Sequence, residues 1–377
     1  MPKPPDTVVI LDQASGYLQI DMLEAYASQY NKRVIVAGTI VERGTALSDD
    51  IKWHRITKYD RSTTIKRIST WLGGSLGMFW IVLTRYRKAH IVAITNPPFS
   101  VFVPWLLGCS YDVVVYDMYP DALVQYGYAK PQGLIYNIWS KLNRLAFENA
   151  RKVFTLTDGM KKLTAQYVQN DKDITVVPLW SDASDFKAVL RKENTILKQT
   201  GGLNKFNIVY SGNLGVTHPV ERLVELAEFL DPNYFGVIII GGGAKKKVLE
   251  QLIKERNYTH VHLLPWQPIE LLTHNLYAGH INVVTLDKEA SDLSIPSKTF
   301  NILSIGNPIL GVCSVNSGLA DLIKKYDCGI ISEGNNLEHL ADELKQLQQD
   351  KLKQKRLKAN SLKASEDFTP ANAKAFI

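Results

Sequence analysis

Short apolar runs alternate along most of the chain with segments in which apolar residues recur every three or four positions. The first pattern is typical of buried strands and the second of amphipathic helices. Their alternation predicts parallel sheets covered by helices. In the first half, the predicted strands are residues 7–11, 33–37, 90–95, 112–116, 152–155 and 174–177.

A second alternating series begins after a polar stretch, residues 178–205, which we interpret as an interdomain linker. The tail from 337 to 362 is rich in Leu, Lys, Gln and Glu and is predicted to be one long helix that ends before Pro370. Proline breaks such a pattern because it cannot continue a helix. The strands predicted for this half are residues 206–210, 235–240, 260–263, 281–285, 308–311 and 329–331.

The length of 377 residues, with 45% hydrophobic and 21% charged residues, fits a globular chain of two domains. We expect residues 1–180 to form the first doubly wound domain and residues 181–362 the second. The segment from about 363 to 377 is expected to pack back on the first.

Cysteine use and the chain start bear on the compartment. Cys109, Cys313 and Cys328 are widely spaced, so neither a metal site nor a disulfide framework is indicated. The apolar run before Asp12 is too short for a secretory signal, and no stretch reaches membrane-spanning length. We therefore expect a protein of the reducing cytoplasm.

The net charge of +7 is unevenly distributed. Residues 51–90 contain a single acid, Asp60, and enclose an apolar, glycine-containing stretch at 71–83. Three interpretations remain open: a peripheral anchor on an anionic membrane, a core helix with a solvated basic end, and a nucleic-acid contact, for which no recognised motif is present. The basic residues of this segment are Lys52, Arg55, Lys58, Arg61, Lys66, Arg67, Arg85, Arg87 and Lys88.

The stretch 206–223, FNIVYSGNLGVTHPVERL, reads as a strand, a glycine turn and an amphipathic helix. Glycine permits a sharp turn and the close approach of a ligand, and the free N–H groups at a helix start attract anions. We expect a phosphate to bind at Gly212 and Gly215. A plain structural turn remains the alternative, because two glycines between a strand and a helix are common.

Three further loops are expected at the same edge, because the carboxyl ends of parallel strands collect the ligand-binding loops. They are GGG at 241–243, LPWQP at 264–268 and IPSKTF at 295–300, which opens a later helix.

Polar loops also end the strands of the first half. Gly16 and Tyr17 follow the first strand, Asn96 follows the third, and Asp117 and Asp121 follow the fourth. The two aspartates are candidates to contact a substrate hydroxyl. The alternative for Asp117 is a helix cap or a turn, since aspartate is a common cap.

Taken together, these motifs resemble the GT-B fold, two Rossmann-like domains that face a cleft, and within it the family-4 retaining glycosyltransferases of bacterial envelope and capsule synthesis. The resemblance covers nearly the whole chain. Its most specific pieces, in order, are YSGNLG at 210–215, IGGG at 240–243, LPW at 264–266, PSKTF at 296–300 and IGNP at 305–308.

The resemblance implies a donor site in the second domain and an acceptor site in the first, near Gly16, Tyr17, Asn96 and Asp121. It implies Lys298 and Asp117 as the catalytic candidates, with Lys298 neutralising the leaving diphosphate. It implies no metal and no cofactor, the nucleotide sugar being a substrate and a UDP-sugar the expected one. The implied donor-binding residues are Gly212, Asn213, Leu214, Gly215, Gly242, Trp266, Gln267, Ser297, Lys298, Thr299 and Asn301.

Some positions depart from the family pattern. Many members carry an Arg and a Lys after the glycine turn, whereas residues 213–218 here read NLGVTH. The second glutamate of the family's paired motif falls near Asn301, and the first maps within residues 292–294. The family's His-Asp pair after the fourth strand corresponds to Tyr116 and Asp117.

The resemblance implies a hexosyltransferase that moves a sugar, with retention, from a nucleotide diphosphate to a hydroxyl of a lipid-linked or glycan acceptor in cell-surface polysaccharide synthesis. Cysteine use predicts a cytoplasmic enzyme, which would contact the inner face of the plasma membrane if the basic and aromatic stretch at 51–90 is exposed, and no nucleic acid is expected as a partner. The alternatives are an inactive nucleotide- or glycan-binding subunit, suggested by Asn301 and the missing Arg/Lys pair, and a nucleotide-sugar epimerase of the same fold.

Overall fold

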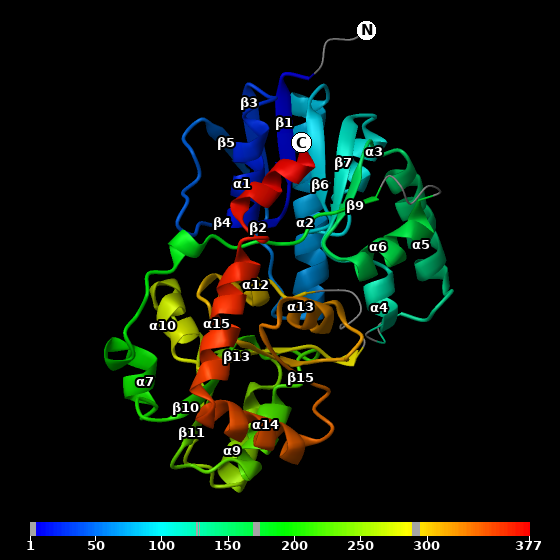
Figure 1. Cartoon of the computed structure of the whole chain (residues 1–377). Helices are drawn as coiled ribbons and strands as arrows, with labels where there is room; N and C mark the ends of the chain where they lie inside the picture. Colours follow the sequence, from blue (N-terminus) through cyan, green and yellow to red (C-terminus); the bar gives the residue numbers. More distant parts are fainter. Residues whose placement is uncertain (1–4, 126, 128, 169–173, 289–294) are drawn as a thin grey trace. The chain divides into compact units, whose positions relative to one another are not determined.

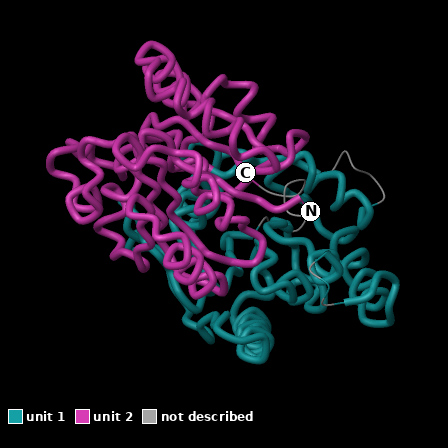
Figure 2. Tube along the Cα trace, turned by 90° about the horizontal axis from the view of Figure 1, so that it is seen from below, with its two compact units in different colours: residues 1–179, 370–377 teal, residues 180–369 magenta. Residues whose placement is uncertain are grey.

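The computed structural model describes residues 5–125, 127, 129–168, 174–288 and 295–377. The chain divides into two compact units, residues 1–179 with 370–377 (unit 1) and residues 180–369 (unit 2) (Figure 2). Each is an α/β unit built on a parallel sheet, which confirms the predicted pair of doubly wound domains.

Unit 1 is built on a parallel sheet that, in the described residues, has seven strands in the order β5-β3-β1-β6-β7-β8-β9 (Figure 1). The strand order reverses between β1 and β6, which is the switch point of a doubly wound sheet. These strands are β1 (Thr7–Leu11), β3 (Lys32–Ala37), β5 (Ile51–Arg55), β6 (His90–Ile94), β7 (Ser110–Val115), β8 (Val153–Thr155) and β9 (Ile174–Val176).

Helices connect these strands, and a short parallel pair, β2 (Ala14–Gly16) with β4 (Thr39–Val41), lies beyond the ends of β1 and β3. The helices are α1 (Tyr17–Tyr26), α2 (Thr64–Ile81) continued by a π-helical turn (Val82–Tyr86), α3 (Phe102–Leu106), α4 (Asp121–Gln125), α5 (Leu134–Glu148) and α6 (Asp158–Thr164), with the 3-10 turn η2 (Ala165–Tyr167).

The sequence pattern missed strand β5. Its residues IKWHR lack an apolar run, so the sequence pattern places them only in the basic segment. An edge strand has one neighbour and needs only one apolar face, so its pattern is weak. β5 pairs in parallel with β3, from Arg33↔Ile51 to Ala37↔Arg55.

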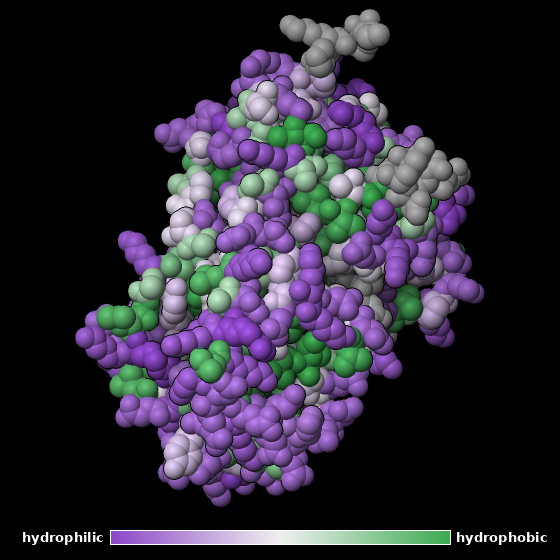
Figure 3. All heavy atoms as spheres, viewed as in Figure 1, coloured by the Kyte–Doolittle hydropathy of each residue, from purple (hydrophilic) through white to green (hydrophobic). Residues whose placement is uncertain are grey.

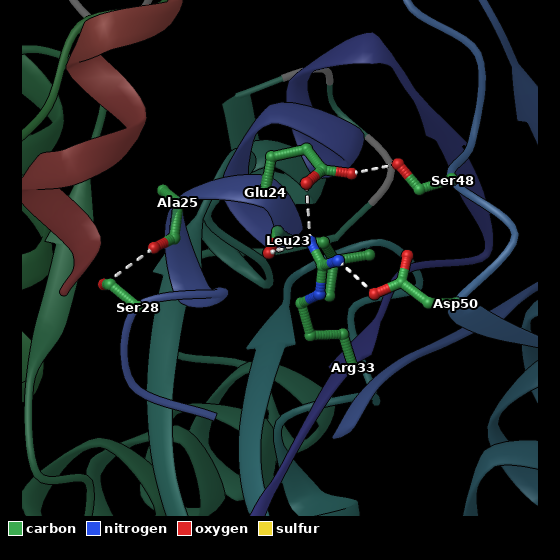
Figure 4. Close-up of polar contacts among 7 residues, drawn as sticks. All are labelled: Leu23, Glu24, Ala25, Ser28, Arg33, Ser48 and Asp50. Atoms are coloured by element: carbon green, nitrogen blue, oxygen red, sulfur yellow. Dashed lines mark hydrogen bonds and ion pairs between the residues drawn. The ribbon is translucent and has the colours of Figure 1, made fainter. Parts of the chain in front are cut away.

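A buried arginine fastens this edge (Figure 4). Arg33 is only 8% exposed, and its Nη1 donates to the Leu23 carbonyl at 3.2 Å and to Glu24 Oε2 at 2.6 Å. Its Nη2 donates to the carboxylate of Asp50, just before β5, while Ser48 Oγ donates to the other oxygen of Glu24. One guanidinium thus links β3, α1 and the segment that leads into β5, as its fork of donors permits.

Unit 2 has its own parallel sheet, with six described strands in the order β12-β11-β10-β13-β14-β15. Its switch point lies between β10 and β13. The strands are β10 (Phe206–Asn213), β11 (Phe235–Gly242), β12 (Val261–Leu264), β13 (Ile281–Thr285), β14 (Ile309–Val312) and β15 (Gly329–Ser332).

The helices of unit 2 are mostly amphipathic. α14 buries Leu340, Leu344 and Leu347 against the sheet, and in Figure 3 hydrophilic residues cover the surface over α9 and α14. The helices are α7 (Thr195–Gln199), α8 (Glu221–Leu226), α9 (Lys246–Glu255), α10 (Leu272–Tyr277), α12 (Lys298–Ser304), α13 (Gly318–Tyr326), α14 (Leu337–Gln349) and α15 (Lys351–Ser365).

The predicted single helix over 337–362 is wrong. Asp350 has φ −84° and ψ 89°, which ends α14, and its carboxylate accepts a hydrogen bond from the Lys353 amide at 2.8 Å, which caps α15. An aspartate side chain satisfies the free amides of a helix start, so a cap interrupts a composition that otherwise reads as continuous helix.

The end of the chain completes unit 1. The 3-10 segment η8 (Pro370–Phe376) packs on α1, where the Tyr26 hydroxyl donates to the Phe376 carbonyl at 3.0 Å. The Phe376 ring lies 4.8 Å from that of Phe154 on β8 and is only 2% exposed. Lys152 Nζ donates to the Ile377 carbonyl at 3.1 Å.

Phe376→Ala should lower the free energy of unfolding of unit 1 by about 3 kcal/mol, because it removes a fully buried aromatic ring. Urea unfolding followed by tryptophan fluorescence measures this, since five of the seven tryptophans lie in unit 1. Leu352→Ala is the control: Leu352 is 79% exposed, and its loss should change the free energy by less than about 0.5 kcal/mol. Equal midpoints for the two variants would contradict the packing role of Phe376.

Candidate active site

Paired glycines lie where β10 and β11 end in unit 2. The two strands pair to their last residues, with Gly212 opposite Gly241 and Asn213 opposite Gly242. Strand β11 comes so close at this point that a Cβ on Gly241 would meet the Gly212 carbonyl oxygen at 1.9 Å. The sheet therefore ends in bare backbone beside its switch point.

Lys298, the first residue of α12, reaches this backbone from the other side of the switch point. A Cβ on Gly212 would lie 2.5 Å from Lys298 Nζ, so a side chain at this position would have to displace the ammonium. Lys298 Nζ also lies 3.7 Å from the centre of the Tyr210 ring, whose π face attracts a cation. The structure thus brings Gly212 and Lys298, two of the predicted site residues, into contact.

The Lys298 ammonium is buried. Nζ is out of contact with solvent and has no hydrogen-bond partner among the described residues. Burial lowers the pKa of Lys298 from 10.5 to about 7, because removal from water disfavours the charged form. Thr299 Oγ1, next in the chain, is also buried and unpaired in the described structure. A cation and a hydroxyl without partners are suited to bind an anion.

His218 is a site residue whose role the sequence did not assign. Its Nδ1 lies 2.9 Å from the Thr285 carbonyl at the end of β13. Burial, and then the charge of Lys298, lower the pKa of its imidazole. Lys245 Nζ donates hydrogen bonds to the Glu221 carboxylate at 2.9 Å and to the His218 carbonyl at 3.0 Å. The sequence pointed to His218 only as the last residue of the stretch 213–218, where many members of the family carry an Arg and a Lys.

The predicted order of strand, glycine turn and helix is present, with a loop between the turn and the helix. α8 begins only at Glu221 and has six residues. Pro219 disfavours helical geometry in the residue before it, so the helix starts after a loop. In this loop Leu214 is fully buried, and its amide and carbonyl bond to Gly242 O and Lys245 N, both at 3.0 Å. The anion-attracting feature at the turn is therefore Lys298 rather than a helix start.

The remaining predicted donor-site residues differ in their availability. Trp266 is 54% exposed and stands over Gly242, where a Cβ would meet its Nε1 at 2.9 Å. Gln267 Nε2 turns back to the Pro265 carbonyl at 2.9 Å. Asn301 Oδ1 accepts a hydrogen bond from Ser181 Oγ at 2.9 Å.

The other predicted donor-site positions are Asn213, Gly215 and Ser297. Asn213 and Gly215 lie side by side, since a Cβ on Gly215 would meet Asn213 Nδ2 at 2.8 Å. Ser297 is exposed and precedes α12 without a side-chain capping bond. Residues 292–294, to which the family's first glutamate maps, lie outside the described residues.

The switch point of unit 1 holds a buried carboxyl group. Asp12 follows β1 and is 1% exposed. Its Oδ1 accepts hydrogen bonds from Asn96 Nδ2 at 2.8 Å and from the Ala14 amide at 3.2 Å. Burial raises the pKa of Asp12 to about 7 against the opposing effect of these bonds. The predicted Asn96 thus contacts Asp12, which the sequence did not single out.

Gly16 and Tyr17 follow at the start of α1. The Gly16 amide donates to Gln19 Oε1 at 2.9 Å, and the Arg43 guanidinium lies 4.2 Å from the centre of the Tyr17 ring.

Asp117 and Asp121 differ in their surroundings. The Asp117 amide donates to Thr95 Oγ1 at 3.1 Å, and the residue keeps solvent contact at a small recess beside Tyr119. Dense protein around its carboxyl raises the pKa of Asp117. Asp121 instead accepts hydrogen bonds from two tyrosine hydroxyls, Tyr136 at 3.0 Å and Tyr167 at 2.5 Å. Asp121 therefore joins α4 to α5 and to η2.

No three His, Cys, Asp or Glu side chains gather as metal ligands would within residues 5–125, 127, 129–168, 174–288 and 295–377.

Two doubly wound parallel sheets in one chain are the architecture of the GT-B class. In this chain each sheet has a titratable group at its switch point. The fold matches a crystal structure of Anabaena Alr3699/HepE in complex with UDP and glucose, with a TM-score of 0.72 and 14% identity over 98% of this chain and 97% of that one. Residues 192–364 match the sequence profile of the glycosyl transferases group 1. Over this part, which lies within unit 2, the chain is similar to glycosyltransferases of that family.

Two relatives share much of the sequence. WcaI of Escherichia coli (strain K12), described by name as a glycosyl transferase of colanic acid biosynthesis, is 24% identical over 70% of this chain and 67% of its own length. WbjE of Pseudomonas aeruginosa, named as a glycosyltransferase, is 21% identical over 72% of this chain and 70% of its own length.

Lys298→Met should flatten the dependence of unfolding free energy on pH between 7 and 9. In this window the unfolded chain keeps the lysine proton, whereas the folded state loses it above pH 7. The unfolded state thus binds more protons, and stability rises with pH by at most about 1.4 kcal/mol per unit.

Urea unfolding at pH 7, 8 and 9, followed by circular dichroism, measures this slope. Lys247→Met, at an exposed lysine of α9, should keep the wild-type slope. Parallel slopes for wild type and Lys298→Met would mean that Lys298 is not a buried base.

Proposed function

We propose that the protein transfers a hexosyl group from a nucleotide diphosphate sugar to a hydroxyl of a lipid-linked or glycan acceptor, with retention of anomeric configuration. The observation that carries this proposal is the unpaired Lys298 ammonium beside Gly212. A diphosphate would be a counter-ion for this buried cation, and the ion pair stabilises the ammonium and the diphosphate.

A UDP-sugar is the proposed donor. The structural neighbour HepE was crystallised with UDP and glucose, and its fold is shared over nearly the whole chain. In this proposal Trp266 and Gln267 border the base, while Ser297, Thr299 and Asn301 contact the diphosphate and the donor sugar. Asn213, Leu214, Gly215 and Gly242 complete the donor loop through their backbone.

The proposed chemistry balances without a metal ion or a dedicated protein base. The bond from the anomeric carbon to the β-phosphate oxygen breaks as the bond to the acceptor oxygen forms on the same face. The acceptor proton passes to the departing phosphate oxygen. Lys298 stabilises the charge that grows on this oxygen, which is the interaction that lowers the barrier.

Unit 1 supplies the acceptor site in this proposal. Asp117 orients the acceptor hydroxyl, and Gly16, Tyr17 and Asn96 line the same sheet edge. Asp121 contributes through its hold on α4 rather than by contact. The names of WcaI and WbjE support a role in cell-surface polysaccharide synthesis. Such acceptors are available at the cytoplasmic face of the plasma membrane, where we place the enzyme as a peripheral protein.

A panel of UDP, GDP, ADP and CMP ligands tests the donor site by thermal stabilisation. We expect UDP and a UDP-sugar to raise the melting temperature, by a free energy of about 2.7 kcal/mol at a hundredfold excess over Kd. The shift should persist in EDTA and in Lys247→Met, and it should collapse in Lys298→Met. If no nucleotide stabilises the wild type, a glycan-binding subunit replaces the enzyme. If Lys298→Met still responds, the donor binds elsewhere.

The affinity for UDP should fall between pH 7 and 9, by up to about tenfold per unit. Free Lys298 is neutral above its pKa of about 7, so the diphosphate binds only with uptake of a proton. Isothermal titration calorimetry in two buffers of different ionisation enthalpy counts that proton. Lys298→Arg should bind UDP without this pH dependence, because a guanidinium stays charged. A flat wild-type profile would contradict the role of Lys298.

A further inference from the structure

Helix α2 carries a row of large apolar side chains on its outer side. Ile65 is 81% exposed, Leu76 69% and Trp80 65%, and Ile68 and Leu72 lie between them at 46% and 50%. Spacings of three and four residues place these five side chains on one stripe of the helix. Residues 71–83 therefore lie only partly in the core: Trp71, Met78 and Val82 are buried, whereas Leu72, Leu76 and Trp80 are exposed. No helix in the described ranges is long and apolar enough to cross a membrane.

The inner side of α2 carries two glycines, Gly74 and Gly77, beside the buried Trp71 and Met78. A Cβ on Gly74 would lie 2.5 Å from Gln13 Nε2, and one on Gly77 would lie 2.9 Å from Ile56 Cγ2. The helix is held there, since Gln13 Nε2 donates to the Thr57 and Thr70 carbonyls at 2.9 and 2.6 Å. The stripe cannot turn inward, because its side chains do not fit where the glycines lie. α14 shows the ordinary arrangement, with leucines inward.

Two neighbouring helices extend the apolar surface. α2 contacts α3, and α3 contacts α5. The ring of Phe99, just before α3, lies 6.5 Å from Trp71 of α2 and 4.9 Å from Trp139 of α5. α3 and α5 also present exposed apolar side chains, at Leu106, Leu134, Ile135 and Ile138. We call the exposed side chains of α2, α3 and α5 the apolar face.

The charges around the apolar face have one sign. Residues 61–111 contain six lysines and arginines and no acid, and residues 122–147 contain three more and again no acid. Over the whole chain, 44 basic residues are nearly balanced by 37 acidic ones. The partner of this face is therefore expected to be anionic as well as apolar.

Among the acids on the adjoining elements, Asp60 offsets part of this charge, because it pairs with Lys66 at 3.6 Å. Asp112 is buried against His90, and Asp121 is held by two tyrosines. Asp117 lies at the recess beside Tyr119, and Glu148 is the last residue of α5.

We propose that the apolar face docks on a bilayer rich in anionic lipids, with Trp80 and Leu76 inserted among the head groups. An apolar stripe bordered by lysine and arginine, with a tryptophan among them, suits the boundary between head groups and acyl chains. Two copies of the chain meeting on this face would oppose nine cations to nine, which disfavours self-association. The inference deepens the proposed function, because it brings unit 1 to the surface where lipid-linked acceptors are found.

Flotation with vesicles tests this docking in the full-length protein. Wild type should float with vesicles of phosphatidylglycerol and phosphatidylcholine, less well in 0.5 M salt, and poorly with phosphatidylcholine alone. Leu76→Gln/Trp80→Gln should lower the partition coefficient at least about tenfold. Arg85→Gln/Lys88→Gln should lower it by about fivefold for each charge. Val248→Gln/Leu352→Gln, exposed apolar positions of unit 2, is the matched control and should float as wild type does.

Each outcome decides the proposal. Equal flotation of all variants, or equal binding to neutral vesicles, overturns it. Self-association of wild type without vesicles that is lost in Leu76→Gln/Trp80→Gln assigns the face to a second copy instead. Circular dichroism confirms that each variant is folded. UDP stabilisation of the same variants reports on the donor site separately, so a failure of membrane docking is distinguishable from a failure of the proposed function.

Discussion

The contact between the Lys298 ammonium and the bare backbone of Gly212 governs the chemistry of unit 2. It requires β10 and β13 to diverge at a switch point, and it requires a residue without a side chain at the end of β10. Burial of the Lys298 charge costs free energy of folding, and the ring of Tyr210 offsets only part of this cost. A site that is unfavourable when empty gains most from an anionic ligand, so the same contact that weakens the fold favours binding.

Unit 1 repeats this arrangement with the opposite charge type. Asp12 lies at its switch point, as Lys298 lies at that of unit 2, and burial brings the pKa of each to about 7. Desolvation favours the neutral form of both groups, which raises the pKa of an acid and lowers that of a base. The difference lies in their partners: Asn96 and the Ala14 amide satisfy Asp12, whereas Lys298 has no hydrogen-bond partner in the described ranges. Asp12 is thereby suited to a structural task, and Lys298 to a ligand.

Buried strands were readable from the sequence because a parallel sheet demands continuous apolar runs, as in β1 and β13, whose predicted and observed limits agree. Features set by tertiary contacts were not readable. β5 depends on Arg33 and its partners for its place. The break at Asp350 depends instead on one local capping bond, which the helix-favouring composition around it conceals. The inward side of α2 is fixed by Gln13 and Ile56, far away in the sequence. Likewise, the motif indicated Lys298, but the burial of its ammonium and the proximity of His218 are properties of the folded unit.

The return of η8 to unit 1 has a consequence for biosynthesis. During translation, all of unit 2 is made between Leu179 and Pro370, so unit 1 leaves the ribosome without the segment that covers Phe154 and α1. The nascent first domain then presents an uncovered apolar surface to chaperones while the second domain is being synthesised. Unit 2 is continuous in the sequence, whereas closure of the first unit must wait until residues 370–377 have been made.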